Sequence, residues 1–193
     1  ESATKVLPLI IFLIYVTIVF AFRSYSQPLI LLAIVPFCLI GVAWGHWIHG
    51  FPMSILSYLG IIGLIGIVVN DGLVYTGRFN DFLKEGLPFD EALYETGRAR
   101  FRAIFLTSIT TIAGLAPLML ERSLQAQFLI PMAISISYGI AVATLLTLFL
   151  LPILLSVSNG IKVFANYLIT GKKPAREEVE RAIKELKVDH VDI

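Results

Sequence analysis

Long apolar runs constrain this chain more than any other feature. Of its 193 residues, 57% are hydrophobic and only 15% are charged, whereas a soluble domain carries about 25% charged residues. A helix needs about 20 apolar residues to cross the hydrocarbon core of a bilayer, and a backbone in lipid must satisfy its hydrogen bonds internally. We therefore predict an all-α membrane protein with five transmembrane helices, over about residues 6–22, 28–48, 53–77, 103–120 and 128–157.

The polar segments between and after these runs predict a transmembrane region over residues 1–159 and a charged tail over residues 160–193. Within the longest polar connection, Pro88 is followed by two acidic residues, a combination typical of a first helical turn. This pattern predicts a short cytoplasmic surface helix over about residues 88–98. A plain solvated loop is the alternative.

The charged tail has its own periodicity. From Pro174 onward, apolar residues recur at helical spacing opposite Glu and Lys, which predicts an amphipathic helix. Such a helix can lie on the membrane surface, dock on a cytoplasmic protein or remain solvated. Its apolar face comprises Ala175, Val179, Ala182, Ile183 and Leu186.

Basic residues indicate the topology. With five spans, thirteen of the fifteen Lys and Arg residues fall on one side, and only Lys5 and Arg122 fall on the other. The positive-inside rule places the thirteen in the cytoplasm, so we expect a periplasmic N-terminus and a cytoplasmic C-terminus. Because no signal-peptide pattern precedes the first span, we also expect a longer polypeptide upstream.

Composition and motifs exclude several classes of function. The formal net charge of +1 gives no electrostatic support for nucleic-acid binding. The single cysteine, Cys38, lies in an apolar run and is expected to be a small core residue. No nucleotide-binding loop, nucleophile motif or zinc motif is present, so we do not expect an enzyme.

One charged residue lies inside a predicted span. Asp71 is the only charged residue between Ser24 and Gly77, and an aspartate at a helix centre costs about 2.5–3.5 kcal/mol to insert. Such a residue is typically a proton or ion site that faces the interior of a helix bundle. The alternative is a structural polar group that is hydrogen-bonded to a Ser or Thr of the next helix.

Other polar residues are candidate partners for this carboxylate. Tyr75 and Arg78 share the helical face of Asp71, whereas Asn70 points about 100° away. The fourth predicted span carries Thr107, Ser108, Thr110 and Thr111 after Arg102. Thr107 and Thr111 are one turn apart and face the same way. Their hydroxyls can bond a carboxylate or a water chain, or alternatively their own helix backbone.

Small residues and histidines in the second and third spans favour structural roles. Gly41 and Gly45 form a GxxxG pattern, and the third span repeats glycine at 60, 63 and 66, which favours close helix packing. His46 and His49 lie near the outer end of the second span. Two histidines are a weak metal signal without further ligands, so we expect interfacial positions and no metal site.

Several motifs in order carry a family resemblance. The sequence GIVVNDGLV at residues 66–74 resembles the tenth transmembrane helix of resistance–nodulation–division (RND) efflux pumps. The RARFR motif at 98–102, followed by residues 106–118, is similar to the start of the family's eleventh helix. Residues 22–28 resemble its turn between helices eight and nine. Glu85-Gly86 and Glu91-Ala92 resemble its cytoplasmic helix between helices ten and eleven.

The resemblance covers about residues 5–157 and implies helices eight to twelve of a twelve-helix bundle. It implies a proton relay in which Asp71, Asn70, Arg102, Thr107 and Thr111 take part. Asn70 departs from the lysine of many drug pumps, and Asp71 replaces the asparagine that follows that lysine. The coupling ion would be the proton, with no cofactor and no metal.

The function implied is proton-motive-force-driven export of small amphiphilic compounds across the bacterial inner membrane, as in multidrug resistance. The implied partners are the remaining helices, a periplasmic porter domain, two further copies in a homotrimer, a periplasmic adaptor, an outer-membrane channel and the lipid bilayer. An RND-like component for lipid or protein export is one alternative. A non-transporting membrane scaffold is another.

Overall fold

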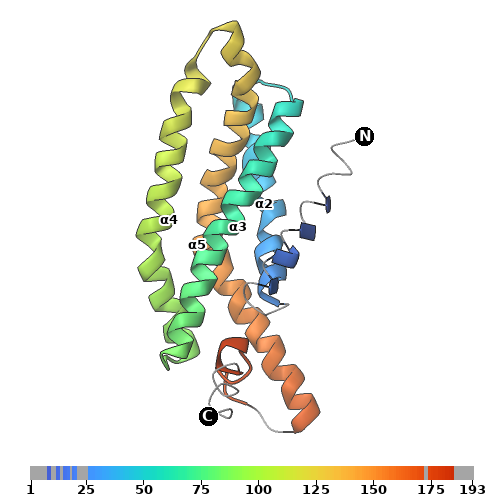
Figure 1. Ribbon diagram of the computed structural model, residues 1–193, viewed down its shortest axis with the longest axis vertical. Coiled ribbons are helices and arrows are strands. Elements are labelled where there is room, and N and C mark those ends of the chain that lie inside the picture. Colours follow the sequence, from blue (N-terminus) through green and yellow to red (C-terminus); the bar gives the residue numbers. More distant parts are fainter. Residues whose placement is uncertain are drawn as a thin grey trace.

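The regular secondary structure of the described residues is helical (Figure 1). The computed structural model describes residues 8, 9, 12, 13, 15–17, 19, 20, 26–171 and 174–184. No strand occurs within these residues, and the predicted all-α fold is confirmed. The first predicted span falls mostly outside them. The four long helices are α2 (Ser26–His49), α3 (Ile55–Lys84), α4 (Phe89–Leu120) and α5 (Leu124–Thr170).

All four helices are long and apolar enough to cross a membrane. They run antiparallel to their neighbours in sequence, so the connections lie at two ends of the bundle (Figure 1). The basal end, at the bottom of Figure 1, holds the α3–α4 connection, residues 85–88. The apical end holds the α2–α3 connection, residues 50–54, and the α4–α5 connection, residues 121–123.

Two helices extend beyond the predicted spans. The predicted surface helix over 88–98 is not separate, because α4 starts at Phe89 and continues without a break into the span. α5 has 47 residues and is about 70 Å long, more than twice the roughly 30 Å of a hydrocarbon core. Its last turns take up the first part of the predicted tail and end at Gly171, whose φ of 68° is left-handed.

Local sequence signals fix the apical helix starts. Ser54 caps α3 through a capping box with Ser57, and the Ser123 side chain accepts a hydrogen bond from the Ala126 N–H at the start of α5. α4 has no such cap of its own, since its N-cap residue Pro88 makes no side-chain hydrogen bond. The start of α4, at the basal end, therefore lacks the side-chain cap that the two apical helix starts have.

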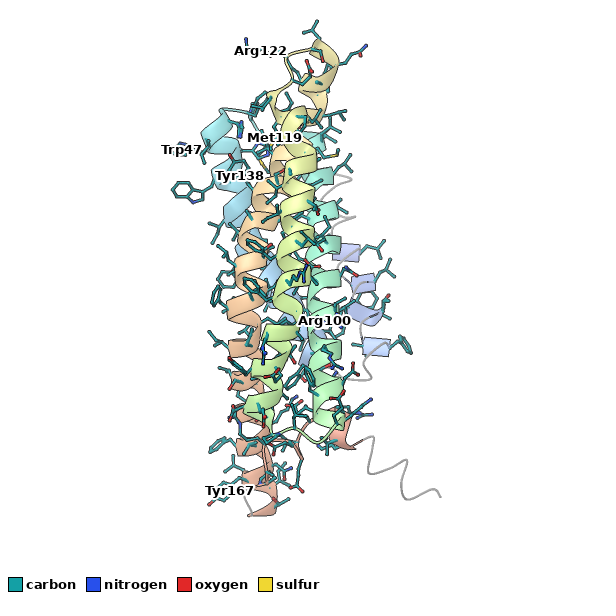
Figure 2. All side chains as sticks on the ribbon, turned by 90° about the vertical axis from the view of Figure 1, so that its left-hand side faces the viewer. Trp47, Arg100, Met119, Arg122, Tyr138 and Tyr167 are labelled. Carbon is teal, nitrogen blue, oxygen red and sulfur yellow. The ribbon has the colours of Figure 1, made fainter. Side chains whose placement is uncertain are left out.

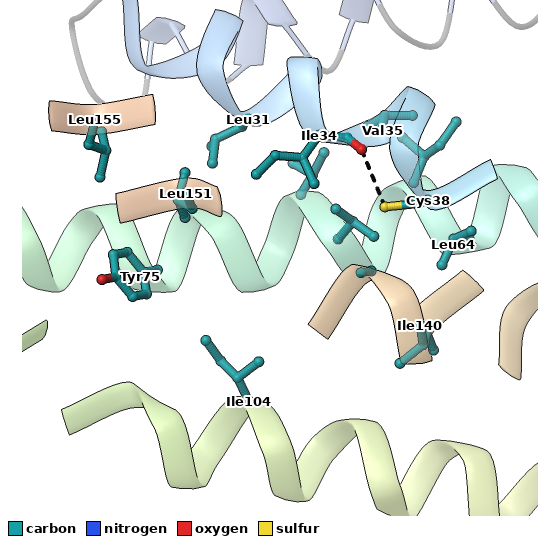
Figure 3. Close-up of a cluster of buried hydrophobic side chains, with 14 of the residues drawn as sticks. Leu31, Ile34, Val35, Cys38, Leu64, Tyr75, Ile104, Ile140, Leu151 and Leu155 are labelled. Atoms are coloured by element: carbon teal, nitrogen blue, oxygen red, sulfur yellow. Dashed lines mark hydrogen bonds between the residues drawn. The ribbon is translucent and has the colours of Figure 1, made fainter. Parts of the chain in front are cut away.

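α5 is the central helix, and α2, α3 and α4 all pack against it. The core includes Leu31, Cys38, Leu64, Ile104 and Ile140, drawn from all four helices (Figure 3). α4 is the least buried of the four, with 11% of its most apolar window buried inside the structure against 33–44% for the others. Much of its apolar surface is therefore open to lipid or to other protein.

Glycines allow α2 and α3 to approach α5 closely. A Cβ added to Gly45 would lie 2.6 Å from the Tyr138 ring, and one added to Gly60 would lie 2.8 Å from the Met132 carbonyl oxygen. Neither position has room for a side chain. By contrast, a Cβ on Gly66 would meet no described atom within 4 Å. The predicted packing role therefore applies to particular glycines only.

Candidate proton-coupling site

Asp71 lies at the edge of the buried face of α3. Val68 and Tyr75, about one turn to either side, are buried, and Asp71 itself is half-buried. Its carboxylate makes no hydrogen bond or ion pair with any other described residue. The preceding residue, Asn70, lies on a different, exposed stripe with Gly63, Gly66 and Val74.

Tyr75 fixes the height of α3 against α4. Its hydroxyl donates to the Leu93 carbonyl oxygen at 3.4 Å and lies 3.6 Å from where a Cβ on Gly97 would be. Asp71 is one turn from Tyr75 toward the apical end, and Arg100 is nearly one turn from Gly97 in the same direction. Because the two helices are antiparallel, Asp71 and Arg100 lie at a similar height.

Arg100 also faces inward on α4. It is half-buried and falls four residues from each of the buried Thr96 and Ile104, so it shares their face. Its Nε atom is buried and has no hydrogen-bond partner within the described part of the chain. Arg100 lies in the lower half of α4 in Figure 2. It is thus the cation of α4 that is best placed to approach Asp71.

The sequence resemblance predicts Arg102, and not Arg100, as the arginine of the proton relay. Arg102 is exposed, makes no hydrogen bond or ion pair with the described residues, and lies about 200° around the helix from Arg100. The signal that could have found Arg100 was the regular four-residue spacing of Thr96, Arg100, Ile104 and Ser108, which places them on one helical face. Whether either arginine takes part in coupling stays a prediction.

The predicted threonines bond to their own helix. The Thr107 hydroxyl donates to the Ala103 carbonyl and the Thr111 hydroxyl to the Thr107 carbonyl, each at 2.8 Å. Thr107 is exposed and Thr111 half-buried. The four helices therefore do not bring these hydroxyls to Asp71, and their part in a relay also stays a prediction.

Ser108 instead provides a polar link between α4 and α5. Its hydroxyl lies within hydrogen-bond distance of the Thr144 hydroxyl on α5, and both residues are buried. Each hydroxyl also reaches the carbonyl of the residue four positions earlier in its own helix, at 2.8 Å. This link holds the middle of α4 against the central helix.

Arg78 forms ion pairs with two carboxylates near the basal end of α3. Its guanidinium lies 3.2 Å from Glu85, 3.8 Å from Asp81 and 3.9 Å from the centre of the Phe82 ring. It shares a helical face with Asp71, but its partners all lie farther toward the basal end. Arg78 therefore leaves Asp71 without a cation from its own helix.

The histidines have structural contacts at the apical end. His46 is buried, and its two ring nitrogens lie 3.0 Å from the Phe51 carbonyl oxygen and from the Ser135 hydroxyl. Because a carbonyl only accepts, Nδ1 must donate to Phe51. His49 lies 3.1 Å from the Tyr138 hydroxyl. No group of three or more metal-ligating side chains occurs among the described residues.

Comparison with known proteins supplies the family. The sequence profile of the AcrB/AcrD/AcrF family matches residues 1–158 of the chain. The chain belongs to this family of RND transporters. It is therefore a multi-pass membrane protein of an efflux family.

Named relatives include proteins of metal resistance, of multidrug resistance and of swarming motility. The chain is 30% identical over 152 residues to the cobalt-zinc-cadmium resistance protein CzcA of Cupriavidus metallidurans, covering 77% of this chain and 14% of that protein. It is 34% identical to the swarming motility protein SwrC of Bacillus subtilis, covering 70% of this chain and 13% of that protein. It is 30% identical to the multidrug resistance protein MdtC of Erwinia amylovora, covering 70% of this chain and 13% of that protein.

A solved structure shares the helix arrangement. The crystal structure of a heavy metal efflux pump superposes with a TM-score of 0.71 at 27% identity, covering 80% of this chain and 15% of that chain. The chain thus spans about one seventh of the length of the transporters that it matches.

Proposed function

We propose that the chain is the C-terminal membrane part of a proton-driven RND exporter in the bacterial inner membrane. The observation that carries this proposal is Asp71, a half-buried carboxylate in an apolar helix with no partner in the described chain. Arg100 on the neighbouring helix lies near its height, and its buried Nε has no hydrogen-bond partner among the described residues. A carboxylate that gains and loses a proton would change its attraction to such a cation.

The free energy available for such a step is modest. A proton entering down the gradient supplies about 1.4 kcal/mol per pH unit and about 2.3 kcal/mol per 100 mV. A charge change at Asp71 would alter the packing of α3 against α4. We infer that this movement is passed to a periplasmic porter domain outside this chain, with the N-terminus periplasmic and the C-terminus cytoplasmic.

An exposed stripe of α3 supports the proposal that further helices pack against this chain. Gly63, Gly66, Asn70 and Val74 lie on one exposed face, and small residues favour close helix approach in lipid. We propose that the remaining transporter helices pack here and bring their own acidic groups to Asn70 and Asp71. A homotrimer with a periplasmic adaptor and an outer-membrane channel would complete the exporter.

Small amphiphilic compounds are the first proposed substrates, and the relative MdtC, named for multidrug resistance, supports them. Divalent transition metals are the second candidate, because CzcA is named for cobalt, zinc and cadmium resistance and the matched crystal structure is a heavy metal efflux pump. Growth of cells that express the full-length transporter, in ethidium and separately in Zn²⁺, distinguishes the two. Protection against only one of these two compounds assigns the substrate class.

The test of proton coupling is Asp71→Asn in the full-length transporter. Asp81→Asn is the matched control, because Asp81 is an exposed carboxylate on the same helix. We expect Asp71→Asn to abolish export with normal amounts of protein in the membrane, and Asp81→Asn to export normally. Full export by Asp71→Asn would exclude the proposed role and favour a structural polar group.

A further inference from the structure

The segment over residues 174–184 folds back onto the basal end of the bundle, as the dark red part of Figure 1 shows. Its last described turn is helical, from 181 to 184, and a run of turns precedes it. Val179 and Ala182 are each only 5% exposed. This part of the predicted amphipathic tail is therefore docked on its own chain.

Arg176 is the centre of the docked segment. Its Nη1 donates to both carboxylate oxygens of Asp90 at 2.7 and 2.8 Å, and its Nη2 donates to the Ser156 hydroxyl at 2.9 Å. Its Nε donates to the Asn159 side chain at 3.2 Å, and the guanidinium lies 4.4 Å from the centre of the Phe89 ring. One side chain thus joins the first turn of α4 to α5.

Glu177 supplies the helix cap that α4 lacks. Its carboxylate accepts a hydrogen bond of 2.7 Å from the backbone N–H of Phe89, the first residue of α4. A carboxylate at this position satisfies an otherwise unpaired N–H and interacts favourably with the positive end of the helix dipole. Because Pro88 provides no side-chain cap, the start of α4 depends on the tail.

Glu180 fixes the segment to α5. It is 3% exposed, and its carboxylate accepts from the Asn159 side chain at 2.8 Å and from the Lys162 ammonium at 2.9 Å. Asn159 is fully buried and also donates to the Arg176 carbonyl at 2.7 Å. These buried polar groups are mutually paired, as a specific interface requires.

We propose that residues 174–184 form a tail clamp that positions α4 against α5 during transport, with Arg176 and Glu177 as its positioning residues. The first turn of α4 is anchored to this segment through the Phe89 N–H and the Asp90 carboxylate. Arg100 lies eleven residues, or about 16 Å, along the helix from Phe89. A shift at the first turn would therefore displace Arg100 relative to Asp71.

The existence of the clamp can be tested without any transport assay. Hydrogen–deuterium exchange of the full-length transporter in lipid nanodiscs reports on the amides of the first turns of α4. We expect Arg176→Glu to speed their exchange at least threefold, and Glu177→Gln to do so less strongly. Lys84→Glu is the charge-matched control, because Lys84 is an exposed basal cation with no partner among the described residues.

A charge swap keeps this test meaningful if a single variant folds poorly. Asp90→Arg combined with Arg176→Asp retains an ion pair of opposite polarity, so we expect partial recovery of protection. Unchanged exchange in Arg176→Glu, or a control that loosens α4 equally, would overturn the clamp.

The positioning role rests on the proposed proton coupling and needs a second measurement. Export of ethidium and of Zn²⁺ by proteoliposomes is measured at several external pH values, for each probe that the wild type carries. We expect Arg176→Glu to lower export at least threefold and to shift its pH profile. Faster exchange in α4 with an unchanged export profile would overturn positioning while leaving the clamp intact. Normal export by Asp71→Asn would refute the proposed function separately.

Discussion

Asp71 is the charged residue that lies within the apolar, membrane-spanning part of α3. A carboxylate in a membrane helix is tolerated when it faces a bundle interior or a partner. Arg78 on its own helix is held by Glu85 and Asp81, and Asp71 itself has no partner in the described chain. The Nε of Arg100, which has no hydrogen-bond partner among the described residues, is the complementary feature on α4. These two groups define the candidate site.

The two arginines of α4 provide a matched comparison at the residue scale. Arg100 faces inward and Arg102 is exposed, so Arg100→Gln should lower export by the full-length transporter at least tenfold and Arg102→Gln by less than twofold. Export is measured at equal amounts of protein in the membrane. Loss of export in Arg102→Gln alone would favour the arginine that the sequence pattern first indicated.

Glu121, in the apical α4–α5 connection, gives a pH-dependent prediction outside the membrane spans. Hydrogen bonds from the backbone N–H groups of Arg122 and Ser123 hold the pKa of its carboxyl below the ordinary value. A lowered pKa stabilises the fold above the carboxyl's ordinary pKa, and this contribution is lost as pH falls through the lowered value. Thermal unfolding should therefore show Glu121→Gln to be less stable than wild type at neutral pH. The difference should vanish in acid, and a difference that grows in acid would contradict the assignment.

At the scale of elements, apolar length identified α2, α3, α4 and α5 from the sequence, because lipid requires about 20 apolar residues per helix. Hydropathy does not determine where such a helix begins or ends outside the membrane. The start of α4 at Phe89 depends on Glu177, 88 residues away. The sequence likewise located the RARFR motif and the hydroxyl residues that follow it, and the packing of α4 then identified Arg100 and Ser108 as inward-facing.

Glycine packing gives a prediction for the α3–α5 contact. Gly60→Ala would place a Cβ 2.8 Å from the Met132 backbone oxygen, whereas Gly66→Ala would meet no described atom within 4 Å. Overpacking costs about 1–3 kcal/mol, so we expect Gly60→Ala to lower the thermal stability of the purified 193-residue chain. Gly66→Ala should leave it nearly unchanged, because this chain lacks the helices proposed to cover the Gly66 stripe. Equal stability of the two variants would contradict the close α3–α5 approach.

The whole molecule is a partial bundle around α5. α4 exposes large apolar side chains such as Phe101, Phe105 and Ile109, and α3 exposes the stripe that contains Asn70. The chain covers about one seventh of its matched relatives. Coupling and substrate binding are therefore expected to require the remaining helices and the periplasmic domain.

That expectation can be tested with the 193-residue chain by itself. Expressed alone, it should reach the membrane but give cells no protection against ethidium or Zn²⁺, because its exposed stripe lacks the helices that complete the relay. The full-length transporter should protect the same cells. Proton-dependent export by the chain alone would contradict the partial-bundle account.

Simultaneous measurement of proton and substrate flux tests the central claim most directly. Proteoliposomes with the full-length transporter, an internal pH dye and whichever of ethidium or Zn²⁺ the wild type carries are given a proton gradient. We predict that the wild type moves protons and substrate together, that Asp71→Asn moves neither, and that Asp81→Asn moves both. Coupled fluxes of wild-type size in Asp71→Asn would contradict the account.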